Sequence, residues 1–227
     1  MAAITKISED DRRRIATAVT TAEGRSAGEI VTIVTGQSDD YADIALIWSA
    51  FVGFLALAAL ATAPDFYLGI YDRLTGGWVQ QWPPRGIFAV ALLVASLKFT
   101  GMWLLQLWRP LRMLLVPGPV KHTRVRARAI ICFKVGAERR THGRTGILIY
   151  LSLRERRAEI VADEAIASKV APEVWGDAMA AMLGPIREGR IADGMCAAVE
   201  QVGAVLAEHF PRAGDDQNEL PDRLIEV

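Results

Sequence analysis

The stretch IALIWSAFVGFLALAALATA, residues 44–63, decides how this chain is organised. It contains no charged side chain, while Asp43 and Asp65 bracket it. As an α-helix it would span about 30 Å, the thickness of the hydrocarbon core of a bilayer. A buried helix of a soluble protein usually interrupts such a run with polar residues. We therefore expect a transmembrane helix whose membrane residues include Ile44, Trp48, Gly53 and Ala63.

A second apolar run, IFAVALLVASLKFTGMWLLQLW, extends from Ile87 to Trp108 and is long enough to cross a bilayer with some tilt. Lys98 lies near its centre, where a lysine costs about 2.5–3.5 kcal/mol on insertion scales. The many leucines and valines can offset that cost. Lys98 either marks a polar site between helices or protomers, or it reaches toward the membrane surface in a segment shifted in depth. We favour the second interpretation.

The linker between the two runs predicts a hairpin rather than one long helix. Pro83, Pro84 and the glycine pair at 76–77 forbid a continuous helix. Tyrosine and tryptophan at high density are typical of the membrane interface, where one end of the ring is wet. The aromatic residues of this linker are Phe66, Tyr67, Tyr71, Trp78 and Trp82.

The distribution of basic residues predicts the orientation of this hairpin. Eleven lysine and arginine residues flank the two runs on their outer sides, at positions 6–25 and 109–128, and two lie in the connecting loop. The positive-inside rule then places both termini in the cytoplasm and the loop outside. The first 43 residues are polar and charged, so we expect no cleavable signal peptide. These features predict a multi-pass protein of a bacterial-type inner (plasma) membrane. Anionic headgroups are expected to attract the basic flank, namely Arg109, Arg112, Lys121 and Arg124.

Composition disfavours three classes of protein: nucleic-acid binders, disulfide-rich domains and zinc proteins. The 26 basic and 26 acidic side chains cancel, so no global charge favours nucleic acid, and we expect no nucleic-acid partner. Cys132 and Cys196 are too few for a disulfide framework and fit a reducing compartment. The three histidines are widely spaced, which disfavours a zinc site.

The polar sequence on either side of the hairpin predicts an α/β domain. Residues 8–25 have the apolar spacing of an amphipathic helix with Ser8 as its N-cap, and the β-branched residues 29–36 predict a strand. After the hairpin, residues 124–141 predict a helix with Ile130, Ile131 and Phe133 on its apolar part.

The remaining pattern adds two strands and more helices. Residues 146–153 are almost continuously apolar, which predicts a strand buried on both faces. Residues 158–163 follow after a short link, so these two strands should form an antiparallel hairpin. Helices are expected from Pro172 to Phe210, and the last residues should form a polar, extended tail. The expected parts are therefore 1–42 and 121–212 for the α/β domain, 43–120 for the hairpin with its basic flank, and 213–227 for the tail.

Several stretches in this order resemble the TPM domain family, which includes thylakoid-lumen proteins linked to photosystem II repair and many bacterial membrane proteins. The resemblance implies a small mixed sheet with helices on both faces, interrupted here by the transmembrane hairpin. Some members of that family bind calcium or hydrolyse phosphate esters weakly, and their soluble domain usually lies outside a membrane anchor. The stretches that carry the resemblance are residues 22–35, 144–166, 173–183, 188–210 and 218–227.

Two acidic clusters are the candidates for a metal site. Asp163 and Glu164 follow one predicted strand, and Asp39 and Asp40 follow another. Ligands often bind at the carboxyl ends of strands in open α/β sheets, and calcium or magnesium prefers carboxylate oxygens. The alternative is that Asp163 caps the following helix and that the other carboxylates are surface charge.

The chain carries no P-loop, GxSxG or HExxH motif. Small residues four apart, Ser49 with Gly53 and Ala91 with Ala95, would let membrane helices approach closely within the hairpin or between protomers. Three functions stay open. The first is a non-enzymatic membrane-anchored module that binds a protein partner or a second copy in assembly or quality control. The others are a metal-dependent phosphatase of modest activity and a small oligomeric channel or transporter that uses Lys98.

Overall fold

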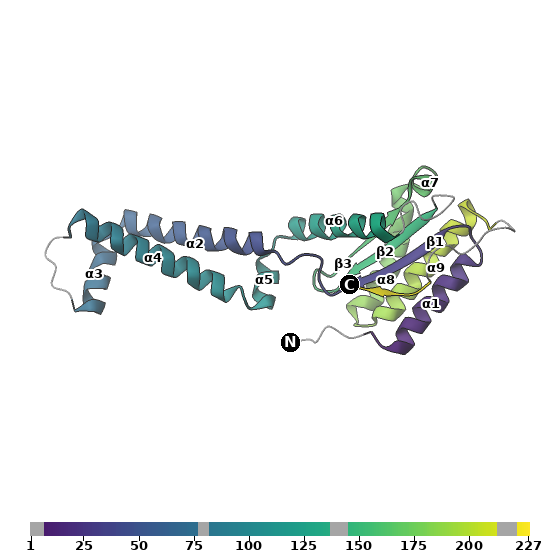
Figure 1. The fold of residues 1–227 in the computed structure, drawn as a ribbon, viewed down its shortest axis with the longest axis horizontal. Coiled ribbons are helices and arrows are strands. Elements are labelled where there is room, and N and C mark those ends of the chain that lie inside the picture. Colours follow the sequence, from purple (N-terminus) through teal and green to yellow (C-terminus); the bar gives the residue numbers. More distant parts are fainter. Residues whose placement is uncertain (1–6, 77–81, 137–144, 213–221) are drawn as a thin grey trace. The chain divides into compact units, whose positions relative to one another are not determined.

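The computed structural model describes residues 7–76, 82–136, 145–212 and 222–227. The chain forms two compact units, of which the first combines Met1–Asp39 with Gly118–Val227 and the second is Asp40–Pro117 (Figure 1). The second unit is therefore inserted into the sequence of the first. Trp78, the end of the helix expected at 141 and residues 213–221 of the tail lie outside the described residues.

The first unit is built on a four-stranded mixed sheet with the order β3-β2-β1-β4. Strands β1 (Glu29–Thr35) and β2 (Gly146–Ser152) pair in parallel along their whole length. Strand β3 (Arg157–Ala162) runs antiparallel to β2, which confirms the predicted hairpin. Every residue of β2 is buried, as its unbroken apolar sequence predicts.

The end of the chain, expected as part of a polar, extended tail, contributes a strand to the sheet. Residues Ile225–Glu226 form β4, which pairs in parallel with β1. The Val227 N–H donates to the Val34 carbonyl at 3.1 Å, and the Leu224 side chain is buried. Two paired residues are too few to produce an alternating pattern, so the sequence alone did not indicate this strand.

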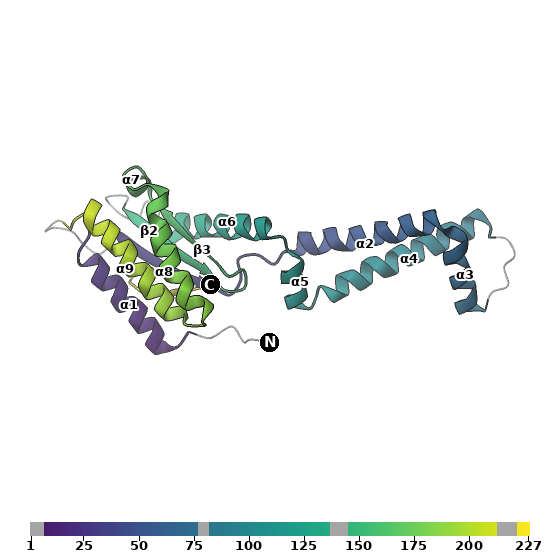
Figure 2. The ribbon, with the colours of Figure 1, turned by 180° about the vertical axis from the view of Figure 1, so that it is seen from behind.

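Three helices cover one face of the sheet, as Figures 1 and 2 show: α1 (Glu9–Glu23), α8 (Trp175–Arg187) and α9 (Ile191–His209). The N-cap predicted for α1 is confirmed, because the Ser8 Oγ accepts from the Asp11 N–H at 3.1 Å in a capping box. The short helices α7 (Glu164–Ala167) and η1 (Pro172–Val174) connect β3 to α8.

Among the described residues, one helix, α6 (Gly118–Gly136), covers the opposite face. It packs through Val125, Ala129 and Phe133 against Leu148 and Tyr150 of β2. The helix begins six residues before the expected start at position 124. Ile131 was expected on its apolar side, yet its side chain is 52% exposed. It lies two residues before the buried Phe133, on a different side of the helix.

The second unit consists mainly of two long helices, α2 (Ala42–Thr62) and α4 (Pro84–Leu105). Both are long and apolar enough to cross a membrane. They pack antiparallel, because Gly53 lies beside Ala95 whereas Ala45 lies beside Gln106. Helices α3 (Pro64–Thr75) and α5 (Arg109–Leu115) each begin at or next to a proline, a position that tolerates the missing N–H. The second apolar run was expected to continue to Trp108, but α4 ends at Leu105.

Candidate functional site

The sheet separates the two acidic clusters that the sequence suggested as a metal site. Asp39 follows the carboxyl end of β1, and Asp163 follows the carboxyl end of β3. Strand β3 is antiparallel to β2, and β2 is parallel to β1. The carboxyl ends of β1 and β3 therefore lie at opposite ends of the strands in the sheet. Accordingly, the Asp163 N–H donates to Gly146 at the beginning of β2, at 2.9 Å. The two clusters therefore do not form one site.

Asp163 acts as a helix cap. Its Oδ1 accepts from the Glu164 N–H at 2.8 Å, and its main-chain carbonyl accepts from the Ala167 N–H at 2.9 Å. Its Oδ2 is buried and makes no hydrogen bond within the described part of the chain. Glu164 points to solvent in the first turn of α7. This arrangement is the capping role given above as the alternative to a metal ligand.

The carboxylates that follow β1 are engaged locally. The Asp39 carboxylate pairs with Arg124 at 3.3 Å. In the second unit, the Asp40 Oδ1 accepts from the Ala42 N–H at 3.1 Å, and its carbonyl accepts from Arg112 at 3.1 Å. In residues 7–76, 82–136, 145–212 and 222–227, no three His, Cys, Asp or Glu side chains converge as they would around a metal ion.

A buried polar network lies beyond the carboxyl ends of β1 and β2. Glu155 accepts from the Ser38 N–H at 2.9 Å and from the Ser152 hydroxyl. The Ser38 hydroxyl also bonds the Tyr150 hydroxyl at 3.0 Å. The network fixes the segment that leads out of β1 to the turn between β2 and β3, where Arg156 adopts a positive φ of 51°. Sequence reasoning missed it, because isolated polar residues after a strand are common in turns.

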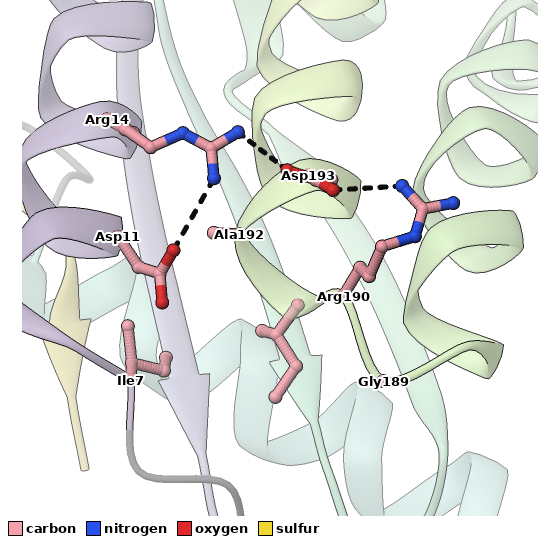
Figure 3. Close-up of a pocket in the computed structure, with 8 residues that line it drawn as sticks. Ile7, Asp11, Arg14, Gly189, Arg190, Ala192 and Asp193 are labelled. Atoms are coloured by element: carbon pink, nitrogen blue, oxygen red, sulfur yellow. Dashed lines mark hydrogen bonds and ion pairs between the residues drawn. The ribbon is translucent and has the colours of Figure 1, made fainter.

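A pocket of about 190 Å³ opens between the beginning of α1 and the loop before α9. Figure 3 shows Asp193 between two guanidinium groups, at 2.6 Å from Arg14 and 2.9 Å from Arg190. The hydrogen bonds from Arg14 and then Arg190 lower the pKa of the Asp193 carboxyl. The lining combines these ion pairs with aliphatic side chains, which suits binding of a small polar group or a side chain. The residues that line the pocket are Ile7, Asp11, Arg14, Gly189, Arg190, Ile191, Ala192 and Asp193.

One feature of the sequence is a signal for this pocket. A glycine followed by an arginine directly precedes the apolar pattern of α9, and Gly189 has a φ of +83° that favours glycine. The other side of the pocket comes from α1, which is distant in the sequence. Arg14 of α1 and its partner Asp193 are 179 positions apart. Spacing alone could not bring them together.

The second unit contains a buried polar contact between its two long helices. The Gln106 side-chain amide donates to the Ala45 carbonyl at 3.0 Å and to the Ser49 hydroxyl at 3.3 Å. Ser49 and Gly53 are buried where α2 faces α4, while Ala95 is half-buried. A Cβ added to Gly53 would lie 3.5 Å from the Ala95 carbonyl oxygen. Ser49, Gly53 and Ala95 thus lie where the helices approach, as predicted, and Gln106 was not foreseen.

The other expected membrane residues lie on the surface or at the ends of the second unit. Lys98 is exposed on α4 and is not enclosed between α2 and α4. Trp48 donates its indole N–H to the Leu115 carbonyl at 3.1 Å, and Trp108 is exposed between α4 and α5. Ile44, Ala63 and Ile87 are half-buried near helix ends, Arg109 is exposed, and Arg112 and Lys121 are partly exposed.

Comparison with known proteins yields a likeness of fold. No protein-family model matches the chain, and no curated protein matches it. The chain is similar to the NMR structure of the BA42 protein from the psychrophilic bacterium Bizionia argentinensis. The TM-score is 0.57 at 16% sequence identity, and the alignment covers 100% of each chain. At this identity the similarity concerns the fold alone.

Proposed function

We propose that this protein is a membrane-anchored binding module, in which α2 and α4 cross the bilayer as a hairpin and the α/β unit binds a protein partner. The observation that carries the anchor is the exposure of large apolar side chains along both helices. Phe54 of α2 is 71% exposed, and Phe88 and Leu92 of α4 are 74% and 70% exposed. Water disfavours so much apolar surface, whereas the hydrocarbon core of a bilayer accommodates it.

The polar groups of the hairpin support the same assignment. Ser49 and Gln106 face each other between the helices and hydrogen-bond, while the apolar side chains point outward. This inversion of the usual pattern is expected when the surrounding medium cannot hydrogen-bond. A core helix of a soluble protein would have the large apolar side chains buried. Only 22% of the apolar window of α2 and 6% of that of α4 is buried.

Two further observations support the nature of the α/β unit. The stretches that resemble the TPM domain family contain its strands, most of α8 and the whole of α9, so we propose membership of that family. The pocket beside Asp193 contains ion pairs and aliphatic groups, a lining that suits recognition of a partner. The charge asymmetry across the hairpin supports a cytoplasmic position for this unit.

Alkaline extraction of membranes tests the anchor. The wild-type chain should stay with the membrane, because its two helices are held by hydrocarbon rather than by charge. Phe54→Lys places a charge near the middle of α2 and should reduce membrane integration. Glu200→Lys, on the exposed side of α9, is the matched control and should behave as wild type. Release of the folded wild-type protein into the alkaline supernatant would contradict the proposal.

A further inference from the structure

Helix α6 has an unusual charge distribution. Its 19 residues include five lysine and arginine side chains and no acidic one. Part of this charge is used within the first unit. His122 and Arg126 lie 3.3 and 3.8 Å from Glu159 of β3, and Arg124 lies 3.3 Å from Asp39. These contacts hold the helix to the sheet and to the end of β1.

The side of α6 that points away from the sheet carries cationic side chains that are exposed to solvent. Arg128 and Lys134 are exposed, and neither forms an ion pair within the described ranges of the chain. Ile131 and Val135 lie beside them at 52% and 69% exposure. Positions 128, 131 and 135 follow the spacing that puts side chains on one stripe of a helix. We call Arg128, Ile131, Lys134 and Val135 the outer face of α6.

We propose that the outer face of α6 binds the anionic phospholipid headgroups of the membrane in which the hairpin is anchored. This inference rests on the proposed function. Basic side chains interspersed with aliphatic ones are the composition of helices that lie at a bilayer surface. The cations attract the headgroups, and the two aliphatic side chains can enter the boundary between headgroups and acyl chains.

Chain connectivity favours lipid over an acidic protein as the partner. Asp39, which pairs with Arg124 of α6, lies three residues before Ala42, the first residue of α2. Three extended residues span at most about 11 Å, a distance comparable to the Debye length in physiological salt. An anchored hairpin therefore tethers the Arg124 part of α6 near the headgroups, and the outer face follows on the same helix, whereas a soluble acidic partner would have to be recruited.

The test uses the full chain in vesicles of phosphatidylcholine, with or without phosphatidylglycerol. A fluorophore is attached to Ile131→Cys after both native cysteines have been replaced by alanine, and a lipid-headgroup quencher reports proximity. Quenching should increase with phosphatidylglycerol and decrease again as salt is added. Arg128→Gln combined with Lys134→Gln should remove the increase, whereas Arg128→Lys combined with Lys134→Arg should retain it. The same fluorophore at Glu200→Cys on α9 is the positional control.

Two failures can be told apart. If the chain does not float with vesicles of phosphatidylcholine alone, the proposed anchor is wrong. If it floats, but quenching at position 131 is independent of phosphatidylglycerol or unchanged in the double glutamine variant, the anchor stands and the lipid-binding role of α6 is overturned. Thermal unfolding of each variant checks that the loss of quenching does not reflect loss of fold.

Discussion

Glu23, the last residue of α1, shows how burial changes the chemistry of one side chain. It is 8% exposed, and its Oε1 accepts from the Ile30 N–H at 2.7 Å. Removal from water raises its pKa to about 8; the hydrogen bond from Ile30 opposes this shift, and Glu29 and Asp222 add to it. Glu23 therefore carries a proton in the folded protein at pH values where it is ionised in the unfolded chain.

This shift makes stability depend on pH. Between the unfolded pKa near 4.5 and the folded pKa of about 8, the folded state binds the extra proton, so stability falls as pH rises. The full slope of one such group is about 1.4 kcal/mol per pH unit. Glu23→Gln should flatten the dependence between pH 5 and 8, measured by chemical unfolding at several pH values. An identical slope in the variant would show that Glu23 is not the group responsible.

Asp163 gives a second prediction, which separates a helix cap from a metal ligand. Asp163→Ala should destabilise the fold by about 1 kcal/mol, and Asp163→Asn by less, because asparagine can also cap a helix. Both effects should be the same with calcium, with magnesium and with chelator. A dose-dependent rise of the wild-type Tm with either ion, lost in Asp163→Asn, would instead support the phosphatase alternative.

The sequence indicated the possible roles of Asp163 but not the behaviour of Glu23. Both roles of Asp163 were visible, because an aspartate after a strand and before a helix serves either as a cap or as a ligand. The direction of β3 relative to β1 decided between a shared site and separate ones. The raised pKa of Glu23 could not be predicted. Its causes include Asp222, which lies far from α1 in the sequence: Asp222 bonds Thr20 of α1 across 202 positions.

The packing of helices α1, α8 and α9 depends on two glycines at which another element approaches closely. A Cβ on Gly203 of α9 would lie 2.6 Å from the Ala22 Cβ, and one on Gly194 would lie 2.5 Å from the Met182 carbonyl oxygen. Real Cβ atoms do not approach other atoms so closely. These positions fix how near α9 lies to α1 and to α8.

Gly203→Ala should therefore destabilise the protein by about 1–3 kcal/mol through overpacking between α1 and α9. The matched control is Gly176→Ala in α8, where the added Cβ would meet open space. That substitution should stabilise by about 0.5–1 kcal/mol, because alanine is the better helix former. Denaturant midpoints of the two variants provide the comparison, and equal effects would contradict the packing described.

Elements with a strong local pattern were predicted well from the sequence. The capping box at Ser8 located α1, and the apolar run of β2 indicated a strand covered on both faces. Helices α3 and α5 and strand β4 were missed. The two helices begin at or next to Pro64 and Pro110, which were not considered as helix starts, and β4 depends on pairing with β1 rather than on its own sequence.

Lys98 bears on how the whole molecule inserts into a membrane and on whether it conducts ions. Its side chain is exposed on α4, which favours a lysine that reaches toward the surface of the proposed membrane. Lys98→Leu should ease membrane insertion by about 2.5–3.5 kcal/mol and leave any ion flux through reconstituted vesicles unchanged. Flux that is present in the wild type and lost in this variant would support the channel alternative.

The second unit, Asp40–Pro117, is inserted between two strands that pair with each other. Strands β1 and β2 are separated by the whole hairpin in the chain, yet they pair along seven residues each. An anchor inserted between them must return the chain to the side from which it left. Two crossings achieve this and one would not. An even number of crossings is therefore a requirement of the proposed anchor. The position of the pocket beside Asp193 could not be inferred from the sequence.

In the proposed topology, α2 and α4 cross the membrane as a hairpin and the α/β unit lies on the cytoplasmic side. Single cysteines at Gly69→Cys in α3 and Glu200→Cys in α9, in a chain whose native cysteines are replaced by alanine, test it most directly. Gly69 has open space around it, so the substitution should be tolerated. A membrane-impermeant maleimide added to intact bacterial cells should label position 69, and position 200 only after the membrane is opened. Labelling of position 200 in intact cells, or protection of both positions until the membrane is opened, would contradict the account.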